Sequence, residues 1–216
     1  MNDTNLLSPE LETEIIELAQ SLIRIKSLPG DEEAAIRLVA QKMTALGYDA
    51  VTIDSMGNVV GRIGRGGTTI LLDAHVDTVA VHDAAEWAIA PFSGEVRNGR
   101  LHGRGSVDMK SAVAAALYAG IVTRNSGWTA GKTIYVSCTV MEEDCDGENL
   151  KHLFQELNLR PDYVLICEPS NNQIMLGHKG KAQMTITTHG VSAHGAAPEK
   201  GKNAIYEMAE IIQRVE

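Results

Sequence analysis

The stretch Ile70-Leu71-Leu72-Asp73-Ala74-His75-Val76-Asp77 decides the fold that we expect, because an apolar run ends in a histidine and an aspartate. Such a run is typical of a buried strand. On an extended strand His75 and Asp77 project to the same side, about 7 Å apart along the backbone. Neutral imidazole is a good metal ligand, and a carboxylate that accepts its other ring N–H fixes the tautomer. A lone His-x-Asp pattern is not enough, so the metal site that it indicates depends on other residues.

Asp108 is the first of these residues, and it has two interpretations. It lies in Gly103-Arg104-Gly105-Ser106-Val107-Asp108, immediately before the helix-forming stretch 111–120. Asp is favoured as a helix N-cap, where it accepts hydrogen bonds from free backbone N–H groups. Alternatively, two metals about 3.5–4 Å apart need a bridging carboxylate, which a loop beside tight glycines can supply.

Further carboxylates follow two other strand-like runs. Glu142 and Glu143 come directly after the β-branched and apolar residues 133–141, and Glu168 follows the run 162–167. The glutamate pair is either a solvated acidic loop, which Asp144, Asp146 and Glu148 would continue, or a pair with different tasks. In the second case one Glu binds a metal and the other is the general base for a metal-bound water. We expect these side chains to converge on one edge of a sheet.

The surrounding sequence alternates helices and strands. Ser8-Pro9 opens a helix that Leu28-Pro29-Gly30 ends, and a second helix is expected over residues 31–46, with Gly47 at its C-terminal left-handed position. Strands are expected near 51–54 and 58–63. This alternation predicts an α/β fold with a layered mixed sheet flanked by helices, in which ligands gather beyond the carboxyl ends of the strands.

The chain resembles the cocatalytic zinc peptidases and deacylases that include succinyl-diaminopimelate desuccinylase, acetylornithine deacetylase, aminoacylase and carboxypeptidase G. The resemblance rests on motifs at 75–79, 103–110, 142–143 and 168–170, and on Gly190-Val191-Ser192-Ala193-His194-Gly195. The spellings at 142–147 and 197–205 look closest to a branch of selenium-metabolism hydrolases.

The resemblance implies a role for each motif residue. His75 and Glu168 would bind one zinc, Glu143 would bind the other, and Asp108 would bridge them and precede a cis peptide bond. The catalytic residues would be Asp77, which orients His75, Glu142, which is the general base, and His194, which stabilises the oxyanion in the partner subunit's active site. The implied activity is hydrolysis of an amide bond in an N-acyl amino acid or short peptide, with two zinc ions that cobalt or manganese could replace.

The resemblance also predicts the domain organisation. Residues 1–178 would form the N-terminal part of a zinc-binding catalytic domain, and residues 179–216 would begin an α+β lid domain through which the full-length form makes a homodimer. We expect a strand over 182–189 and an amphipathic helix over 203–216. Family members are roughly twice as long and carry a last zinc-binding histidine that has no counterpart here. The alternative is therefore a truncated, inactive fragment that binds one metal or self-associates through the lid.

Composition limits the partners and the compartment. A net charge of −9 and a pI near 5.3 argue against a nucleic-acid-binding surface, and no run approaches the ~18 apolar residues of a membrane span. The three cysteines form no CxxC pair, which points to a reducing compartment. With no signal peptide recognised at the start of the sequence, we expect a cytoplasmic enzyme that acts on small molecules or short peptides.

Overall fold

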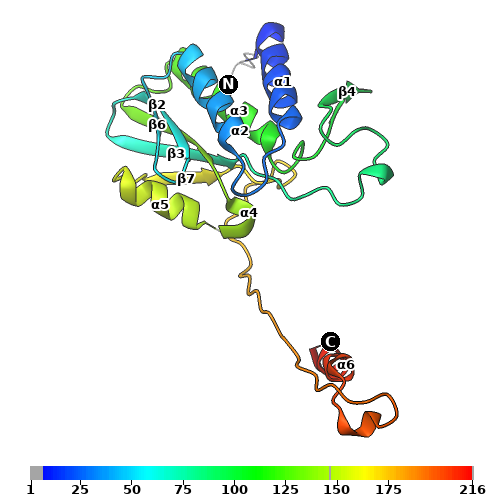
Figure 1. The fold of residues 1–216 in the computed structure, drawn as a ribbon. Coiled ribbons are helices and arrows are strands. Elements are labelled where there is room, and N and C mark those ends of the chain that lie inside the picture. Colours follow the sequence, from blue (N-terminus) through cyan, green and yellow to red (C-terminus); the bar gives the residue numbers. More distant parts are fainter. Residues whose placement is uncertain (1–6, 146, 216) are drawn as a thin grey trace. The chain divides into compact units, whose positions relative to one another are not determined.

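The computed structural model describes residues 7–145 and 147–215 (Figure 1). Asp146 of the acidic segment and Glu216, the last residue of the helix predicted over 203–216, lie outside these residues. The chain divides into two units, Met1–Gln173 and Ile174–Glu216. The assignment of these units to a catalytic domain and a lid stays a prediction.

The first unit is built on a mixed five-stranded sheet in the order β1-β2-β6-β3-β7. Its strands are β1 (Ala50–Ile53), β2 (Val59–Gly64), β3 (Thr68–His75), β6 (Lys132–Thr139) and β7 (Tyr163–Ile166). The pairs β1–β2 and β2–β6 are antiparallel, whereas β3 is parallel to both β6 and β7. The predicted α/β fold with a mixed sheet is therefore confirmed.

Helices cover both faces of this sheet (Figure 1). One face carries α1 (Pro9–Arg24), α2 (Glu33–Ala45) and α3 (Lys110–Asn125), and α5 (Glu148–Glu156) lies on the other. The short α4 (Glu142–Cys145) follows β6, and a loop with the 3-10 helix η1 (Ala84–Glu86) leads to the hairpin of β4 (Glu95–Arg97) and β5 (Arg100–His102).

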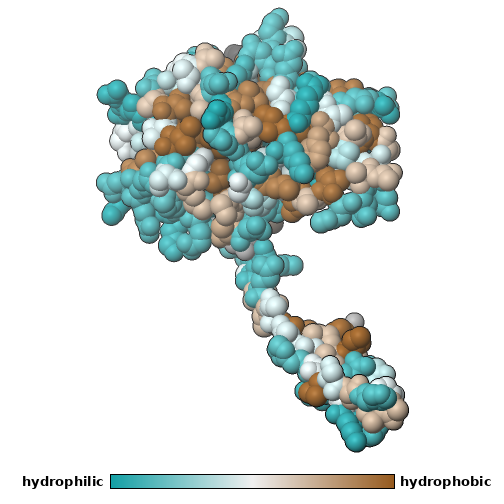
Figure 2. Space-filling model, viewed as in Figure 1, coloured by the Kyte–Doolittle hydropathy of each residue, from teal (hydrophilic) through white to brown (hydrophobic). Residues whose placement is uncertain are grey.

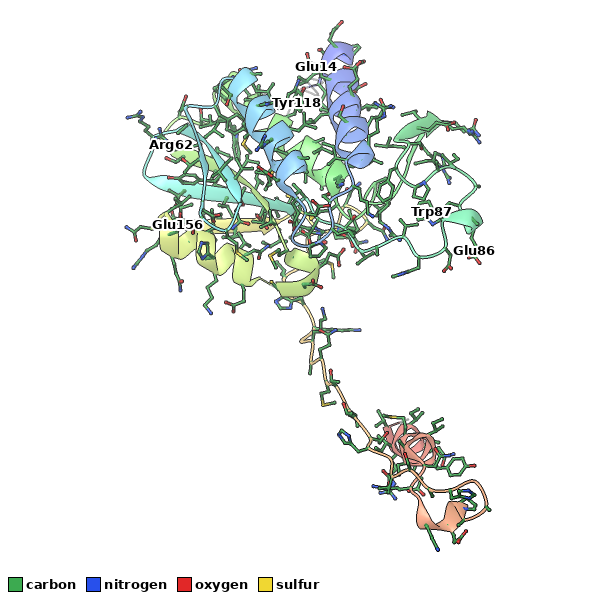
Figure 3. The ribbon with its side chains drawn as sticks, in the orientation of Figure 1. Glu14, Arg62, Glu86, Trp87, Tyr118 and Glu156 are labelled. Carbon is green, nitrogen blue, oxygen red and sulfur yellow. The ribbon has the colours of Figure 1, made fainter. Side chains whose placement is uncertain are left out.

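The ends of α1 and α2 follow the sequence signals. The Ser8 side chain accepts a hydrogen bond from the backbone N–H of Leu11, and Pro9 occupies the first turn of α1, as predicted. After α2, Gly47 has φ of +75°, the left-handed conformation that glycine adopts without strain. The Tyr118 hydroxyl of α3 donates a 2.7 Å hydrogen bond to Glu14 of α1 (Figure 3). This hydrogen bond joins α3 to α1, and buried residues of the helices and of the sheet form one hydrophobic core.

The second unit contains the 3-10 helix η2 (Pro198–Lys200) and α6 (Ala204–Val215). The predicted strand over 182–189 is wrong, because the described residues there form no strand, and the bridge between Val191 and Lys202 is isolated. A strand persists only when a neighbour pairs with its backbone N–H and C=O groups. Apolar side chains of α6 remain exposed (Figure 2), namely Ile205, Ile212 and Val215.

Candidate metal centre

His75, the last residue of β3, is the hub of the candidate site. Its ring is only 2% exposed, and its Nδ1 lies 3.0 Å from the backbone oxygen of Asp77 and 3.3 Å from the Asp77 carboxylate. Because a carbonyl oxygen can only accept, Nδ1 donates this hydrogen bond, and Nε2 faces the opposite way. Nε2 lies 3.1 Å from Oδ1 of Asp108, at the start of α3.

The structure excludes one of the two interpretations of Asp108. The N-cap of α3 is Met109, which makes no side-chain capping hydrogen bond, so the helix-cap interpretation of Asp108 is wrong. The peptide bond between Asp108 and Met109 is cis, as the resemblance implies. Gly105 in the same loop has φ of +81°, and a Cβ there would come within 2.7 Å of the Thr78 side chain. This glycine therefore allows the loop before Asp108 to approach the end of β3 closely.

The glutamate pair lies in α4 instead of a solvated loop. The two Asp77 carboxylate oxygens each accept one backbone N–H, from Glu142 at 3.2 Å and from Glu143 at 3.0 Å. Asp77 thus contacts His75 through its backbone oxygen and through Oδ1. Its two carboxylate oxygens also cap the backbone N–H groups of the two glutamates. A carboxylate at a helix N-terminus is favourable because free N–H groups point toward it.

Two carboxylates complete the cluster around the same ring nitrogen. Oε2 of Glu142 lies 3.8 Å and Oε1 of Glu168, just after β7, lies 3.7 Å from His75 Nε2. Six of the predicted residues are therefore brought together at the carboxyl ends of β3, β6 and β7, namely His75, Asp77, Asp108, Glu142, Glu143 and Glu168.

The electrostatics of the cluster favour a cation. Burial lowers the pKa of His75, but hydrogen bonds to Asp108 and Asp77 and the charge of Glu168 outweigh it and raise the pKa to about 11. Burial raises the pKa of Glu168 to about 7, and burial together with the charge of Asp108 raises the pKa of Glu143. His75 also lowers the pKa values of Asp77 and Asp108. A divalent ion among these carboxylates would supply further positive charge and lower the pKa values of Glu168 and Glu143 again.

Two groups of donor atoms lie close enough to hold metal ions. One comprises His75, Asp108 and Glu143, and the other comprises His75, Glu142 and Glu168, with the ligand atoms of each group within 4.8 Å of one another. Imidazole and carboxylate donors in this number suit zinc and related divalent ions. The donor set therefore fits a divalent metal, and it places Glu142 among the groups that can reach one.

Sequence reasoning missed three buried charged residues beside the centre. Lys110 donates from Nζ to the backbone oxygens of Leu22, at 3.0 Å, and Ile25, at 2.6 Å, and burial lowers its pKa to about 8. Asp73 accepts a 2.6 Å hydrogen bond from Ser137, and burial raises its pKa to about 6. The third residue is Glu32, which is 5% exposed and lies at the N-cap of α2. Because most charged residues are exposed, a single charged residue in a sequence is expected to lie at the surface. Only the structure shows that these three are buried.

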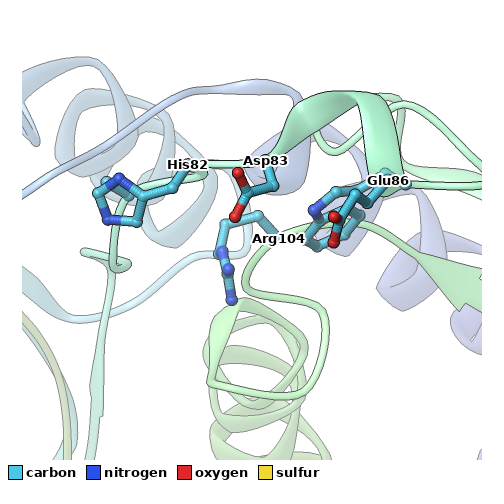
Figure 4. Close-up of a pocket in the computed structure, with 6 residues that line it drawn as sticks. His82, Asp83, Glu86 and Arg104 are labelled. Atoms are coloured by element: carbon cyan, nitrogen blue, oxygen red, sulfur yellow. The ribbon is translucent and has the colours of Figure 1, made fainter.

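An open pocket of about 370 Å³ lies beside the segment that leaves the centre (Figure 4). Ala80 in its lining follows Asp77 closely in the chain, and Arg104 lies four residues before Asp108. The Arg104 guanidinium stacks 5.3 Å from the Trp87 ring. The other lining residues are His82, Asp83 and Glu86. His82 and Trp87, which carried no assigned role in the sequence, therefore line a polar pocket.

His194 lies in the second unit and is exposed there. Its Nδ1 accepts a 3.1 Å hydrogen bond from the backbone N–H of Ala196, which is a local contact. The role of His194 in an active site stays a prediction.

Comparisons with known proteins agree on one family. A model of the peptidase family M20/M25/M40 matches residues 71–215. The uncharacterised protein YgeY of Escherichia coli (strain K12) is 34% identical over 203 residues, which are 94% of this chain and 50% of that protein. Succinyl-diaminopimelate desuccinylase 2 of Ruegeria sp. (strain TM1040) is 30% identical over 210 residues, 92% of this chain and 53% of the enzyme. The chain thus spans about half the length of these relatives.

Solved structures show the same fold. The M20 family metallo-carboxypeptidase Sso-CP2 from Sulfolobus solfataricus matches with a TM-score of 0.61 and 22% identity, over 74% of this chain and 37% of that one. The YXEP protein of Bacillus subtilis, described as a dinuclear metal binding peptidase from the M20 family, matches with a TM-score of 0.58 and 15% identity, over 74% of this chain and 43% of its own.

Among the described residues, no helix has the length and apolar character that crossing a membrane requires.

Proposed function

The chain belongs to the peptidase family M20/M25/M40, and on that premise we propose that it supplies the metal-binding part of a hydrolase that cleaves an amide bond. The observation that carries this proposal is the single buried imidazole of His75, faced by the carboxylates of Asp108, Glu142 and Glu168. The substrate class that we propose is an N-acyl amino acid or short peptide. A desuccinylase among the relatives and peptidases among the structural neighbours support this class.

We assign the metal ligands as the family resemblance implies. His75 and Glu168 would hold one zinc ion, Glu143 would hold the second, and Asp108 would lie between them. The donor groups bring His75 together with Glu168 and Asp108 together with Glu143, as this assignment requires, and they also join His75 to Glu143 and Glu142 to Glu168. A neighbour described as dinuclear supports the number of metals. Cobalt or manganese would suit the same donors. A bound pair of divalent ions would polarise the substrate carbonyl and lower the pKa of a water to about 7.

The chain's own residues would then move the proton. Glu142 accepts a proton on its carboxylate from the water that attacks the carbonyl carbon, and gives it to the amine nitrogen as the C–N bond breaks. Its backbone N–H is held by Asp77, so the carboxylate starts from a fixed helix terminus. The backbone oxygen of Asp77 also accepts a hydrogen bond from Nδ1–H of His75, which leaves Nε2 directed at the cluster.

The second unit would act through assembly. We propose that it belongs to a lid domain and that the full-length protein forms a homodimer, in which His194 of one subunit stabilises the oxyanion in the other. The exposed apolar side chains of α6 fit a unit that packs against further protein. All three cysteines are free, which fits the cytoplasmic location that we propose.

Metal content per chain tests this function. Protein purified without chelator is titrated with zinc, dialysed and analysed for bound metal, beside a His75→Ala variant. A complete cocatalytic site needs about two ions, so two tightly held ions per chain would support the full ligand assignment, and the variant should hold fewer. No bound metal in the unaltered chain would refute the assignment. A single bound ion would favour the alternative of a chain that binds one metal without turnover.

A further inference from the structure

The backbone N–H groups of Met141, Glu142 and Glu143, which are consecutive in the chain, each donate a hydrogen bond to a buried carboxylate. Asp77 accepts from Glu142 and Glu143, as described above, and Oε1 of Glu32 accepts from the N–H of Met141 at 2.9 Å. Asp77 is fully buried and Glu32 is 5% exposed. The backbone that carries the glutamate pair is therefore fixed at three successive points.

Met141 needs such support because of its backbone conformation. Its φ is +56°, the left-handed region that residues other than glycine adopt at a cost. Such a residue persists only where its surroundings enforce it. The Met141 carbonyl oxygen also accepts the N–H of Cys145, which closes the only turn of α4. A change of conformation at Met141 would therefore reorient the whole of α4.

Glu32 is a firm reference point for this turn. It is the N-cap of α2, where its backbone oxygen accepts the N–H of Ile36 at 3.0 Å. Ala35 and Ile36 in the first turn of that helix are buried in the core. The contact from Glu32 to Met141 spans 109 positions of the sequence and ties the helical layer to the end of β6.

The Glu32 carboxylate is buried, and besides the Met141 N–H it meets the backbone N–H groups of Gly30 and of Glu32 itself. Removing a carboxylate from water is unfavourable unless its hydrogen bonds compensate. Glu32 also lies near the negative charge of Asp77, which adds repulsion. A charged acceptor makes a stronger hydrogen bond than a neutral one, but an amide oxygen in the same place would keep the geometry of the contact with Met141.

We propose that Glu32 is a positioning residue that holds Met141 in its left-handed conformation and thereby sets the direction of the Glu142 and Glu143 carboxylates. Glu32 touches neither metal nor substrate and acts through the turn. The inference rests on the proposed function only where it concerns metal binding. The fixation of the turn is a property of the chain with or without a metal.

Amide hydrogen exchange, followed by NMR on the metal-free chain, tests the fixation itself. The variants are Glu32→Ala, which removes the acceptor, and Glu32→Gln, whose amide oxygen can still accept the Met141 N–H. Glu33→Gln is the matched control, because the Glu33 side chain is 77% exposed and pairs with Arg37. We expect Glu32→Ala to speed exchange at least tenfold at Met141, Glu142 and Glu143 together, with near-normal rates in the other two variants. Faster exchange at Met141 alone, or at none of the three, would overturn the proposal.

Cobalt binding supplies the second readout. We expect Glu32→Ala to weaken Co²⁺ binding about 10–100-fold, as loss of an outer partner of a metal ligand does, and to change the visible spectrum of the bound ion. Rescue by Glu32→Gln would separate positioning from a general loss of stability, which thermal unfolding monitors. If Glu32→Ala does not fold, Glu32→Asp replaces it, because the shorter side chain keeps the charge and withdraws the acceptor. A chain that binds no cobalt would refute the proposed function, and hydrogen exchange would still decide the role of Glu32. Unchanged cobalt affinity and spectrum in a folded Glu32→Ala variant would overturn the positioning role.

Discussion

Exchanging Glu142 and Glu143 for glutamine, one at a time, separates the proposed base from the proposed ligand. Both residues lie in the first turn of α4, and the backbone N–H of each is held by Asp77. Glutamine keeps the size of the side chain and leaves these backbone hydrogen bonds in place. Both variants should therefore fold, and their effects should report on the carboxylates themselves.

The expected magnitudes differ in kind. A general base contributes about 10²–10⁴-fold to rate, which corresponds to about 3–5 kcal/mol of activation free energy. Glu142→Gln should therefore lower kcat by about that factor and keep both metal ions. Glu143→Gln should lose one metal ion per chain. If the ion is still bound, its affinity should fall by more than the about 10–100-fold that is lost when an outer partner of a metal ligand is removed. Its turnover should recover in part at high metal concentration.

The assay combines metal analysis with turnover. The assay uses a polypeptide that carries this sequence and has the full length of the relatives. Bound metal per chain is measured after dialysis against buffered free zinc. Hydrolysis of N-acyl amino acids is followed through the amine that it releases. Asp144→Asn is the matched control, because Asp144 lies in the same helix, is exposed and loses the same charge. The structure places Glu142 in a donor group with His75 and Glu168. If Glu142→Gln releases metal while Glu143→Gln retains it, the two glutamates have been assigned wrongly.

Three further substitutions test other parts of the structure. Asp77→Asn weakens the hold on His75 and on the start of α4, so metal affinity in a chelator competition should fall about 10–100-fold; an unchanged affinity would contradict its orienting role. Lys110→Met leaves two backbone oxygens at the end of α1 without their charged donor and should cost about 2 kcal/mol in urea unfolding; equal stability would mean that the cost of burying the ammonium cancels its hydrogen bonds. His194→Ala should lower turnover about 10²–10³-fold without changing metal content; an unchanged rate would remove its oxyanion role.

The sequence predicted the first unit well because its signals are local. The cap at Ser8, the left-handed Gly47 and the apolar run before His75 each depend on neighbours in the chain, and each has its predicted place. The strand predicted over 182–189 failed for the opposite reason. Its composition suits a strand, but a strand also needs a partner, and none pairs with it among the described residues.

In the candidate centre, too, the local features could be predicted from the sequence and the long-range contacts could not. Residues at the ends of predicted strands could be placed at one sheet edge from the sequence, because parallel strands bring their carboxyl ends together. The sequence assigned Asp77 one partner, His75, which lies two residues away. Its second task, at the N–H groups of Glu142 and Glu143, spans 65 and 66 positions and has no local signal. Glu32 was missed for the same reason, since its partner Met141 is remote in the chain.

The topology of the sheet explains why the centre forms where it does. β3 lies between β6 and β7 and is parallel to both, with His75 opposite Thr139 and Asp73 opposite Ile166. The segments that follow these three strands therefore leave the sheet at one edge and carry one histidine and several carboxylates into a small volume. The antiparallel β1 and β2 lie on the far side of β6 and contribute no member of the donor groups. Carboxylates that lie this close together repel one another unless positive charge is near. The topology that brings them together therefore also favours the binding of a cation among them.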